Sequence, residues 1–195
     1  MDIRTPTGTA FDLATITAAV EEHQPDLVFV THGESSTGVL QPLEGLGPLC
    51  HRNNCLLAVD TVASLGGNPV EADKLEIDII YTGSQKVLGV PPGTAPISFS
   101  DRAVAAFKAR TKPPCSFYLD LDWLGQYWNC WEGRGRIYHH TGPVNTMYGL
   151  REGLAMVAEE GLENCWRRHR LAADTLQAGI AELGLEMFVP DPKAR

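Results

Sequence analysis

The chain has 195 residues, of which 44% are hydrophobic, and its formal net charge is −8 at pH 7. This length and composition suit one globular domain, or most of a larger one. The acidic balance argues against nucleic acid or an anionic membrane surface as the main partner. No apolar run is long enough to cross a bilayer. The five cysteines form no C-x-x-C pair, and no Cys/His spacing fits a zinc site.

Strand-like and helix-like stretches alternate over the first half of the chain. Asp12 is expected to cap a helix that runs to about Glu22, and a second, short helix is expected over 43–52. Four apolar runs of strand length are present, at 27–30, 56–60, 77–81 and 96–99. Because these runs are continuously apolar rather than alternating, they predict strands covered on both faces. Strands separated by helices indicate an α/β domain with a largely parallel sheet.

The pattern changes after a predicted helix at 101–110. Residues 111–141 are rich in proline, glycine and aromatic rings. They are expected to be irregular and to serve as a functional loop or an interface. Two long helices are predicted next, the first ending at Gly161 and the second at Gly184. Residues 185–189 have the pattern of a further strand.

Lys86 closes the segment Tyr81-Thr-Gly-Ser-Gln-Lys86, directly after a predicted strand and a turn of small residues. That position is the carboxyl end of the strand, the edge at which ligands bind in open α/β sheets. A lysine there can form an imine with an aldehyde cofactor once it loses its proton, which partial burial and nearby positive charge favour. On this segment alone, an ordinary surface lysine remains an open alternative.

Asp60 ends the apolar run Leu56-Leu-Ala-Val-Asp60. Burial of an unpaired charge is costly, so packing alone does not explain a carboxylate there. A carboxylate facing a pyridine nitrogen keeps that nitrogen protonated, and the ring then serves as an electron sink. The alternative is a helix N-cap on the following segment. Together, however, Asp60 and Lys86 have the arrangement of pyridoxal-phosphate (PLP) enzymes of the aspartate-aminotransferase fold.

Five segments carry a closer resemblance: Thr31-His-Gly-Glu-Ser-Ser-Thr-Gly-Val-Leu-Gln-Pro42, Val59-Asp-Thr-Val-Ala-Ser-Leu-Gly-Gly67, Gly83-Ser-Gln-Lys86, Pro91-Pro-Gly-Thr94 and Tyr138-His-His-Thr141. They resemble the alanine–glyoxylate (serine–pyruvate) aminotransferases of the class V family over nearly the whole chain. The resemblance implies a fold type I large domain, a mostly parallel sheet flanked by helices, in incomplete form. Residues 1–160 would be the PLP-binding large domain without its N-terminal part. Residues 161–195 would be a long helix and the start of a truncated C-terminal small domain.

The resemblance also implies roles for single residues. Lys86 would be the Schiff-base lysine and would move a proton between the substrate Cα and C4′ of the cofactor. Asp60 would be the partner of the pyridinium nitrogen, and Val62 would pack against one ring face. Ser35 would hydrogen-bond near the ring hydroxyl or the substrate, and Gln85 would contact the phosphate. The implied reaction is amino transfer from alanine, or serine, to glyoxylate.

Tyr138 and Thr141 resemble residues that reach the phosphate of the neighbouring subunit's cofactor. The resemblance therefore implies a homodimer with shared active sites, acting on small amino acids and 2-oxo acids. Animal members of the family are typically peroxisomal and some are mitochondrial, so a peroxisomal location is expected ahead of a cytoplasmic one.

Family members also carry an N-terminal phosphate-binding turn with a stacking aromatic residue and a C-terminal arginine for the substrate carboxylate, which have no counterpart here. Two alternatives stay open: a truncated, non-catalytic or merely dimerising fragment, and a related PLP lyase or desulfurase on the same core. The adjacent His139 and His140 are expected to point to opposite sides of an extended segment, so no metal site is expected.

Overall fold

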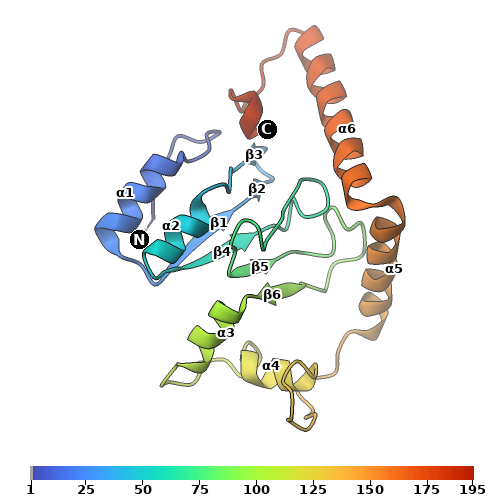
Figure 1. Cartoon of the computed structure of the whole chain (residues 1–195). Helices are drawn as coiled ribbons and strands as arrows, with labels where there is room; N and C mark the ends of the chain where they lie inside the picture. Colours follow the sequence, from blue (N-terminus) through green and yellow to red (C-terminus); the bar gives the residue numbers. More distant parts are fainter. Residues whose placement is uncertain (1) are drawn as a thin grey trace.

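The computed structural model describes residues 2–195, and its main sheet has four strands in the order β1-β4-β5-β6 (Figure 1). The strands β1 (Leu27–Thr31), β4 (Leu56–Asp60) and β5 (Ile79–Tyr81) run parallel, and β6 (Ile97–Phe99) runs antiparallel to β5. All four strands fall on the predicted apolar runs. The predicted α/β fold with a largely parallel sheet is therefore confirmed.

The register of the parallel strands aligns their carboxyl ends. Thr31 pairs with Asp60, and Asp60 pairs with Tyr81. A short hairpin made of β2 (Gly33–Glu34) and β3 (Val39–Leu40) follows β1. The hairpin, Asp60 and the turn after Tyr81 consequently all start from one edge of the sheet.

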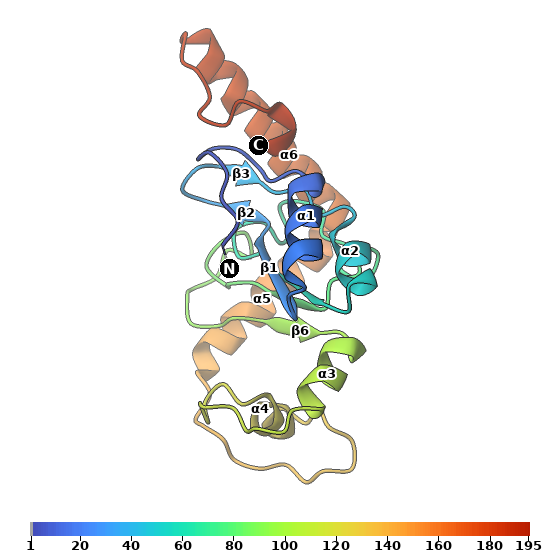
Figure 2. The same cartoon turned by 90° about the vertical axis from the view of Figure 1, so that its left-hand side faces the viewer.

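The hydrophobic core lies between one face of the sheet and two helices, α1 (Leu13–His23) and α2 (Leu46–Arg52) (Figure 2). Asp12 caps α1 as predicted, because its carboxylate accepts a hydrogen bond from the backbone N–H of Thr15 at 2.6 Å. The buried side chains of the core are Ile16, Val20, Leu43, Leu46, Leu49, Cys50, Cys55, Leu57, Val59 and Ile77.

The opposite face of β1 is open. Val28 and Val30 pack against the core, so the alternating side chains of Leu27 and Phe29 point away from it. Leu27 is 44% exposed and Phe29 is 56% exposed. The prediction of strands covered on both faces is therefore wrong for β1, because α1 and α2 both pack on the core side.

The segment predicted to be irregular contains a helix, α4 (Leu121–Tyr127). Asp120 caps it by accepting a hydrogen bond from the backbone N–H of Asp122 at 2.9 Å. The ring of Trp131 packs directly on Gly125, and its Nε1–H donates to the backbone carbonyl of Asp122 at 3.1 Å. The prediction of irregular structure is therefore wrong for 121–127. The helix is stabilised by Trp131, which follows it in the sequence and packs on it.

Two long helices, α5 (Val144–Glu160) and α6 (Leu162–Glu182), form an arm beside the sheet (Figures 1 and 2). They meet at Gly161, as predicted, where the backbone φ of +82° suits a residue without Cβ. The guanidinium of Arg168 donates to the carboxylate of Glu160 at 2.6 and 2.8 Å across this junction. The two helices are therefore joined by both a turn and an ion pair.

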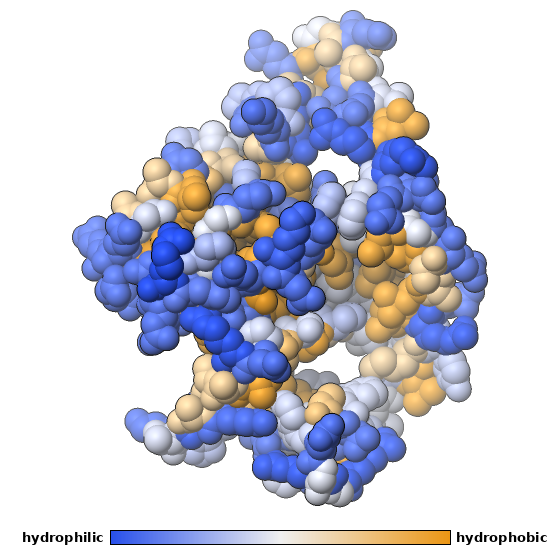
Figure 3. Space-filling view, viewed as in Figure 1, coloured by the Kyte–Doolittle hydropathy of each residue, from blue (hydrophilic) through white to orange (hydrophobic). Residues whose placement is uncertain are grey.

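One contact of the arm with the rest of the molecule is at Gly153, which is buried in α5. A Cβ at Gly153 would lie 2.6 Å from Val90 Cγ1 and 2.8 Å from the carbonyl oxygen of Leu88. Figure 3 shows apolar surface over α5. The exposed apolar side chains of the two helices are Val144, Tyr148, Leu154, Met156, Leu162, Leu171 and Leu176. No helix among residues 2–195 has the length and apolarity needed to span a membrane.

The strand predicted at 185–189 is not formed, because this segment pairs with no strand of the described sheets. The chain instead turns back after Gly184, and Phe188 lies against Gly8. Val189 is buried, and the short 3₁₀ helix η1 (Pro192–Ala194) contacts β3.

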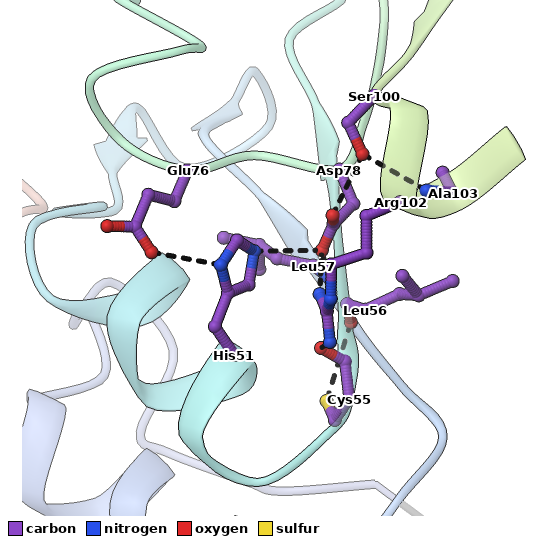
Figure 4. Close-up of polar contacts among 9 residues, drawn as sticks. All are labelled: His51, Cys55, Leu56, Leu57, Glu76, Asp78, Ser100, Arg102 and Ala103. Carbon is purple, nitrogen blue, oxygen red and sulfur yellow. Dashed lines mark hydrogen bonds and ion pairs between the residues drawn. The ribbon is translucent and has the colours of Figure 1, made fainter. Parts of the chain in front are cut away.

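A buried carboxylate, Asp78, joins several elements at the amino end of β5 (Figure 4). It accepts hydrogen bonds from the backbone N–H of Leu57 at 2.9 Å and the hydroxyl of Ser100 at 2.9 Å. The guanidinium of Arg102, in α3 (Asp101–Lys108), donates to it at 2.7 Å. These contacts fix α3 and β4 to the start of β5.

His51 completes this cluster from α2. Its Nε2 lies 3.4 Å from Asp78 Oδ2, and its Nδ1 lies 3.0 Å from Glu76 Oε2. Arg102 also donates to the backbone carbonyl of Cys55 at 2.7 Å. The contacts of His51 with Asp78 and Glu76 thus give it a structural role at the amino end of β5 (Figure 4).

Candidate active site at the carboxyl edge of the sheet

The carboxylate of Asp60 is held by two donors. Its Oδ1 accepts a hydrogen bond from the backbone N–H of Val62 at 2.8 Å, and its Oδ2 accepts one from the hydroxyl of Tyr81 at 2.6 Å. The bond to Val62 stabilises the turn that follows β4. The alternative interpretation of Asp60 as a helix N-cap is wrong, because the described residues between β4 and β5 form no helix. Because a carboxylate oxygen has more than one acceptor position, both oxygens keep capacity for another donor.

Backbone bonds tie Asp60 to the strands and loops around it. The N–H and the hydroxyl of Thr61 both donate to the carbonyl of Tyr81, at 2.9 and 2.7 Å. The hydroxyl of Thr82 donates to the carbonyl of Thr61 at 3.3 Å, and the N–H of His32 donates to the carbonyl of Asp60 at 2.9 Å. The position of the carboxylate is therefore set by β5 on one side and by the start of the hairpin on the other.

His32 links the hairpin to the turn after β4. Its side chain is buried, and its Nδ1 lies 2.9 Å from the hydroxyl of Ser64. Burial lowers the pKa of His32 below its ordinary value, which favours the neutral ring. These contacts are structural and place the hairpin next to Asp60.

Ser35 lies in the exposed turn of the hairpin between β2 and β3. The neighbouring Glu34 holds this turn, because its carboxylate accepts from the backbone N–H groups of Ser36 and Thr37 at 2.9 and 2.8 Å, and from the Thr37 hydroxyl at 2.6 Å. These hydrogen bonds, led by that of the Thr37 side chain, lower the pKa of Glu34 to about 2. Ser35 is thus presented on an ordered turn.

Lys86 lies in the turn that follows β5, and its side chain is exposed. The turn itself is ordered, because the hydroxyl of Ser84 donates to the carbonyl of Pro91 at 2.8 Å and the N–H of Val90 donates to the carbonyl of Ser84 at 3.2 Å. The described residues therefore place the lysine, exposed to solvent, at the expected edge of the sheet.

Val62, Gly83 and Gln85 come together between the two turns. A Cβ at Gly83 would lie 3.2 Å from Val62 Cγ1 and 2.9 Å from Gln85 Oε1. A glycine at this position lets the turns after β4 and β5 approach closely. The side chains predicted to contact the cofactor ring and phosphate consequently share one small area.

Tyr138 and Thr141 lie elsewhere, on the loop between α4 and α5. Their hydroxyl groups are 2.6 Å apart, and Tyr138 is 71% exposed. The described residues do not bring this pair into contact with Asp60 or Lys86.

The two adjacent histidines do not point to opposite sides of the chain. His139 Nδ1 lies 2.8 Å from His140 Nδ1, so that prediction is wrong. The reason is the stacking of His139 on Phe117, with ring centroids 4.3 Å apart, and a contact of its Nε2 with the Phe117 carbonyl at 3.0 Å. Within residues 2–195, no cluster of three or more His, Cys, Asp or Glu side chains is suited to a metal ion.

A cavity of about 730 Å³ lies along β1, between α1, the segment before it and the hairpin. Glu34 and Thr37 line it, but none of the seven predicted cofactor residues does. The candidate site is thus an open sheet edge and not an enclosed cavity.

A largely parallel sheet flanked by helices is the architecture of the large domain of PLP-dependent aminotransferases of fold type I. The family model for class-V aminotransferases ("Aminotransferase class-V") matches residues 3–195. The chain belongs to the class-V aminotransferase family.

Individual relatives agree with this assignment. The chain is 54% identical over 188 residues to the alanine–glyoxylate aminotransferase of Felis catus, covering 96% of this chain and 45% of the relative. It is 48% identical over 189 residues to that of Drosophila melanogaster, with 96% and 48% covered. The chain therefore spans about half the length of the curated relatives it matches.

Solved structures show the same fold. The alanine–glyoxylate aminotransferase of Nostoc sp. superposes with a TM-score of 0.89 at 43% identity, over 94% of this chain and 48% of that one. The ureidoglycine–glyoxylate aminotransferase of Bacillus subtilis superposes with a TM-score of 0.89 at 38% identity, over 96% and 49%. The predicted family and fold are confirmed.

The cofactor of this family is PLP, and the residues at the carboxyl edge fit it. Asp60 is held in place and keeps acceptor capacity for a pyridinium N–H. Gly83 leaves the area between Val62 and Gln85 free of a side chain. Lys86 is accessible from solvent. Sequence reasoning missed Tyr81, although it opens the segment that ends in Lys86.

Proposed function

We propose that this chain supplies the lysine and aspartate of an aminotransferase site that moves an amino group from alanine, or serine, to glyoxylate. The products are pyruvate, or hydroxypyruvate, and glycine. The single observation that carries the proposal is the position of Asp60 and the Lys86 turn at one sheet edge, in a chain of the class-V family. The names of the relatives from Felis catus and Drosophila melanogaster support alanine and glyoxylate as substrates.

Each of the predicted site residues has its own role in this proposal. When bound, PLP supplies an electron-withdrawing ring. The carboxylate of Asp60 holds a proton on the ring nitrogen, and Lys86 Nζ binds the cofactor aldehyde and moves the proton of the substrate Cα. Val62 packs against the ring, and Gln85 and Ser35 provide hydrogen bonds to the phosphate and to the ring hydroxyl or substrate.

The proposed division of the chain places residues 1–160 in the PLP-binding large domain and 161–195 at the start of a small domain. The turn at Gly161, which separates α5 from α6, supports this boundary.

We also propose a homodimer in which Tyr138 and Thr141 serve the partner subunit's cofactor. Support comes from the exposure of both side chains. Exposed rings on the same part of the chain provide apolar surface for a partner: Phe117, Tyr118, Trp123 and Trp128. Sedimentation analysis tests the dimer. The proposed compartment is the peroxisome, by family resemblance, and imaging of a tagged protein tests it.

The deciding experiment maps the cofactor lysine. The purified chain is incubated with PLP and reduced with borohydride, which fixes the carbon–nitrogen bond between PLP and lysine, and the labelled peptide is identified by mass spectrometry. We expect stoichiometric label on Lys86, none in K86A, and unchanged label in K74A. Lys74 is the matched control, since it is exposed and forms a surface ion pair with Glu71 at 3.0 Å.

The same variants are then assayed with alanine and glyoxylate. Loss of the proton-transferring lysine is expected to lower turnover by at least about 100-fold. Near-normal turnover by K86A would contradict the proposed role. Label scattered over many lysines would mean that these 195 residues do not assemble the site, and the non-catalytic alternative would then stand for this chain.

A further inference from the structure

Tyr81 reaches the functional carboxylate from the neighbouring strand. It is the last residue of β5 and lies directly opposite Asp60 in the parallel register. Its hydroxyl donates to Asp60 Oδ2 at 2.6 Å, a short distance typical of a hydrogen bond to an ionised acceptor. The other oxygen of Asp60 is held by the backbone of Val62. The two donors come from different elements and together fix the plane of the carboxylate.

A second ring supports the Tyr81 ring. Phe29 stacks on Tyr81 with centroids 6.4 Å apart and an interplanar angle of 18°. These rings come from β1 and β5, which flank β4 on either side. Phe29 pairs with Ala58 in the sheet, and the short side chain of Ala58 leaves room for two rings to meet above β4. Phe29 is 56% exposed, on the face of β1 that points away from the core.

The phenol of Tyr81 is suited to act as a constant hydrogen-bond donor. Partial burial, together with the hydrogen bond to Asp60, raises the pKa of Tyr81 to about 12. The phenol therefore keeps its proton at neutral pH, and its O–H group donates a hydrogen bond to the carboxylate of Asp60. A carboxylate that is held at two oxygens loses less freedom when it binds a third donor, which lowers the cost of binding.

We propose that Tyr81, supported by Phe29, is a positioning residue that orients Asp60 toward the pyridinium nitrogen of the cofactor. The assignment rests on the proposed function. Tyr81 acts through Asp60, so its contribution to PLP binding requires the carboxylate. A merely structural tyrosine would weaken PLP binding equally whether or not Asp60 is present.

A double-mutant cycle separates these two cases. The dissociation constant for PLP is measured by spectroscopic titration for the wild-type chain, Y81F, D60A and the double variant. We expect Y81F to weaken binding about tenfold in the presence of Asp60, the size of one hydrogen bond to a charged group. In the D60A background we expect less than about a twofold further change.

Two more variants complete the design. Y148F is the matched control, because Tyr148 is 70% exposed and lies on α5, and it is expected to bind PLP like the wild type. F29L removes the stacked ring but keeps an apolar side chain. It should weaken PLP binding in the same direction as Y81F, by a smaller factor, and again only when Asp60 is present.

The outcomes distinguish this assignment from the function on which it rests. Equal effects of Y81F with and without Asp60, or no effect of Y81F in saturable binding, would overturn the positioning role and leave the proposed function intact. No saturable binding and no label on Lys86 in the wild-type chain would overturn both. Unfolding curves of each variant show that the differences arise from binding and not from loss of fold.

Discussion

Asp60 and Asp78 lie at opposite ends of the same pair of strands, and both follow apolar residues in the sequence. Asp78 is 1% exposed, and its donors include the guanidinium of Arg102. Asp60 is only partly buried, and its donors are a backbone N–H and a phenol, both uncharged. Asp78 is thus paired with a cation of its own chain, whereas the described donors to Asp60 are uncharged.

The difference separates a structural carboxylate from a functional one. A buried charge is stable only when it is paired and fully hydrogen-bonded, so Asp78 needs every contact that it makes. Within the described residues, Asp60 takes part in no ion pair and keeps acceptor capacity at the sheet edge where ligands bind. A strand-end aspartate without a cation from its own chain is therefore the better candidate for a cofactor.

The largest expected effect tests the structural half of this comparison. D78A leaves the guanidinium of Arg102 without its partner and the N–H of Leu57 without an acceptor. The free energy of unfolding is expected to fall by about 3–5 kcal/mol, as when one member of a buried pair is removed. Chemical denaturation followed by circular dichroism measures it.

D60A is the matched variant at the other end of the strands. It removes two hydrogen bonds from a partly buried carboxylate, and the expected loss of stability is about 1 kcal/mol. Equal losses of unfolding free energy for D60A and D78A would show that both carboxylates are structural, and would contradict the distinction between them.

The strands and α1 could be predicted from the sequence, because apolar runs and a capping aspartate act locally. α4 could not, since its stability depends on the packing of Trp131 on Gly125. The open face of β1 could not be predicted either, because a run of apolar residues does not indicate whether helices cover one face of the sheet or both. The strand predicted at 185–189 failed for a related reason: a strand requires a partner.

Asp60 and the turn that carries Lys86 could be predicted because they end two apolar runs. The place of Tyr81 could not be predicted, because the register that sets it opposite Asp60 is a property of the sheet. Tyr138 and Thr141 remain predictions, since the partner surface that would use them lies outside one copy of the chain.

A second prediction concerns how the two strand ends are held. The amino end has the Asp78 cluster, whereas the loop after Lys86 is packed against Gly153 of α5. G153A would place a Cβ 2.6 Å from Val90 Cγ1 and 2.8 Å from the Leu88 carbonyl oxygen. The expected cost is about 1–3 kcal/mol of unfolding free energy, typical of overpacking. Thermal and chemical denaturation measure it.

G179A is a control that is expected to raise the free energy of unfolding, where G153A lowers it. Gly179 lies inside α6, and a Cβ there would meet nothing within 4 Å. Because alanine favours a helix more than glycine does, this change is expected to stabilise the chain by up to about 1 kcal/mol. A stabilising G153A would mean that α5 does not pack on the lysine loop as described.

The smallest effect is expected at Glu34, a carboxylate beside the candidate site whose hydrogen bonds all stay within its own turn. Its pKa falls from 4.5 in the unfolded chain to about 2 in the folded one. A group with a depressed folded pKa adds stability that is complete above the unfolded value and is lost as the pH falls through the folded value. The stability difference between the wild type and E34Q should therefore be largest above pH 5 and shrink toward pH 2.

Urea denaturation at several pH values between 2 and 6 measures this difference, with E186Q as an exposed control whose difference from the wild type should not change in the same way. The result also bears on the site, since the Glu34 turn presents Ser35. If the difference between the wild type and E34Q stayed constant over that range, the turn would not be held by the ionised carboxylate. Ser35 would then lack an ordered position from which to contact a cofactor, and Asp60 and Lys86 alone would carry the argument for the carboxyl edge.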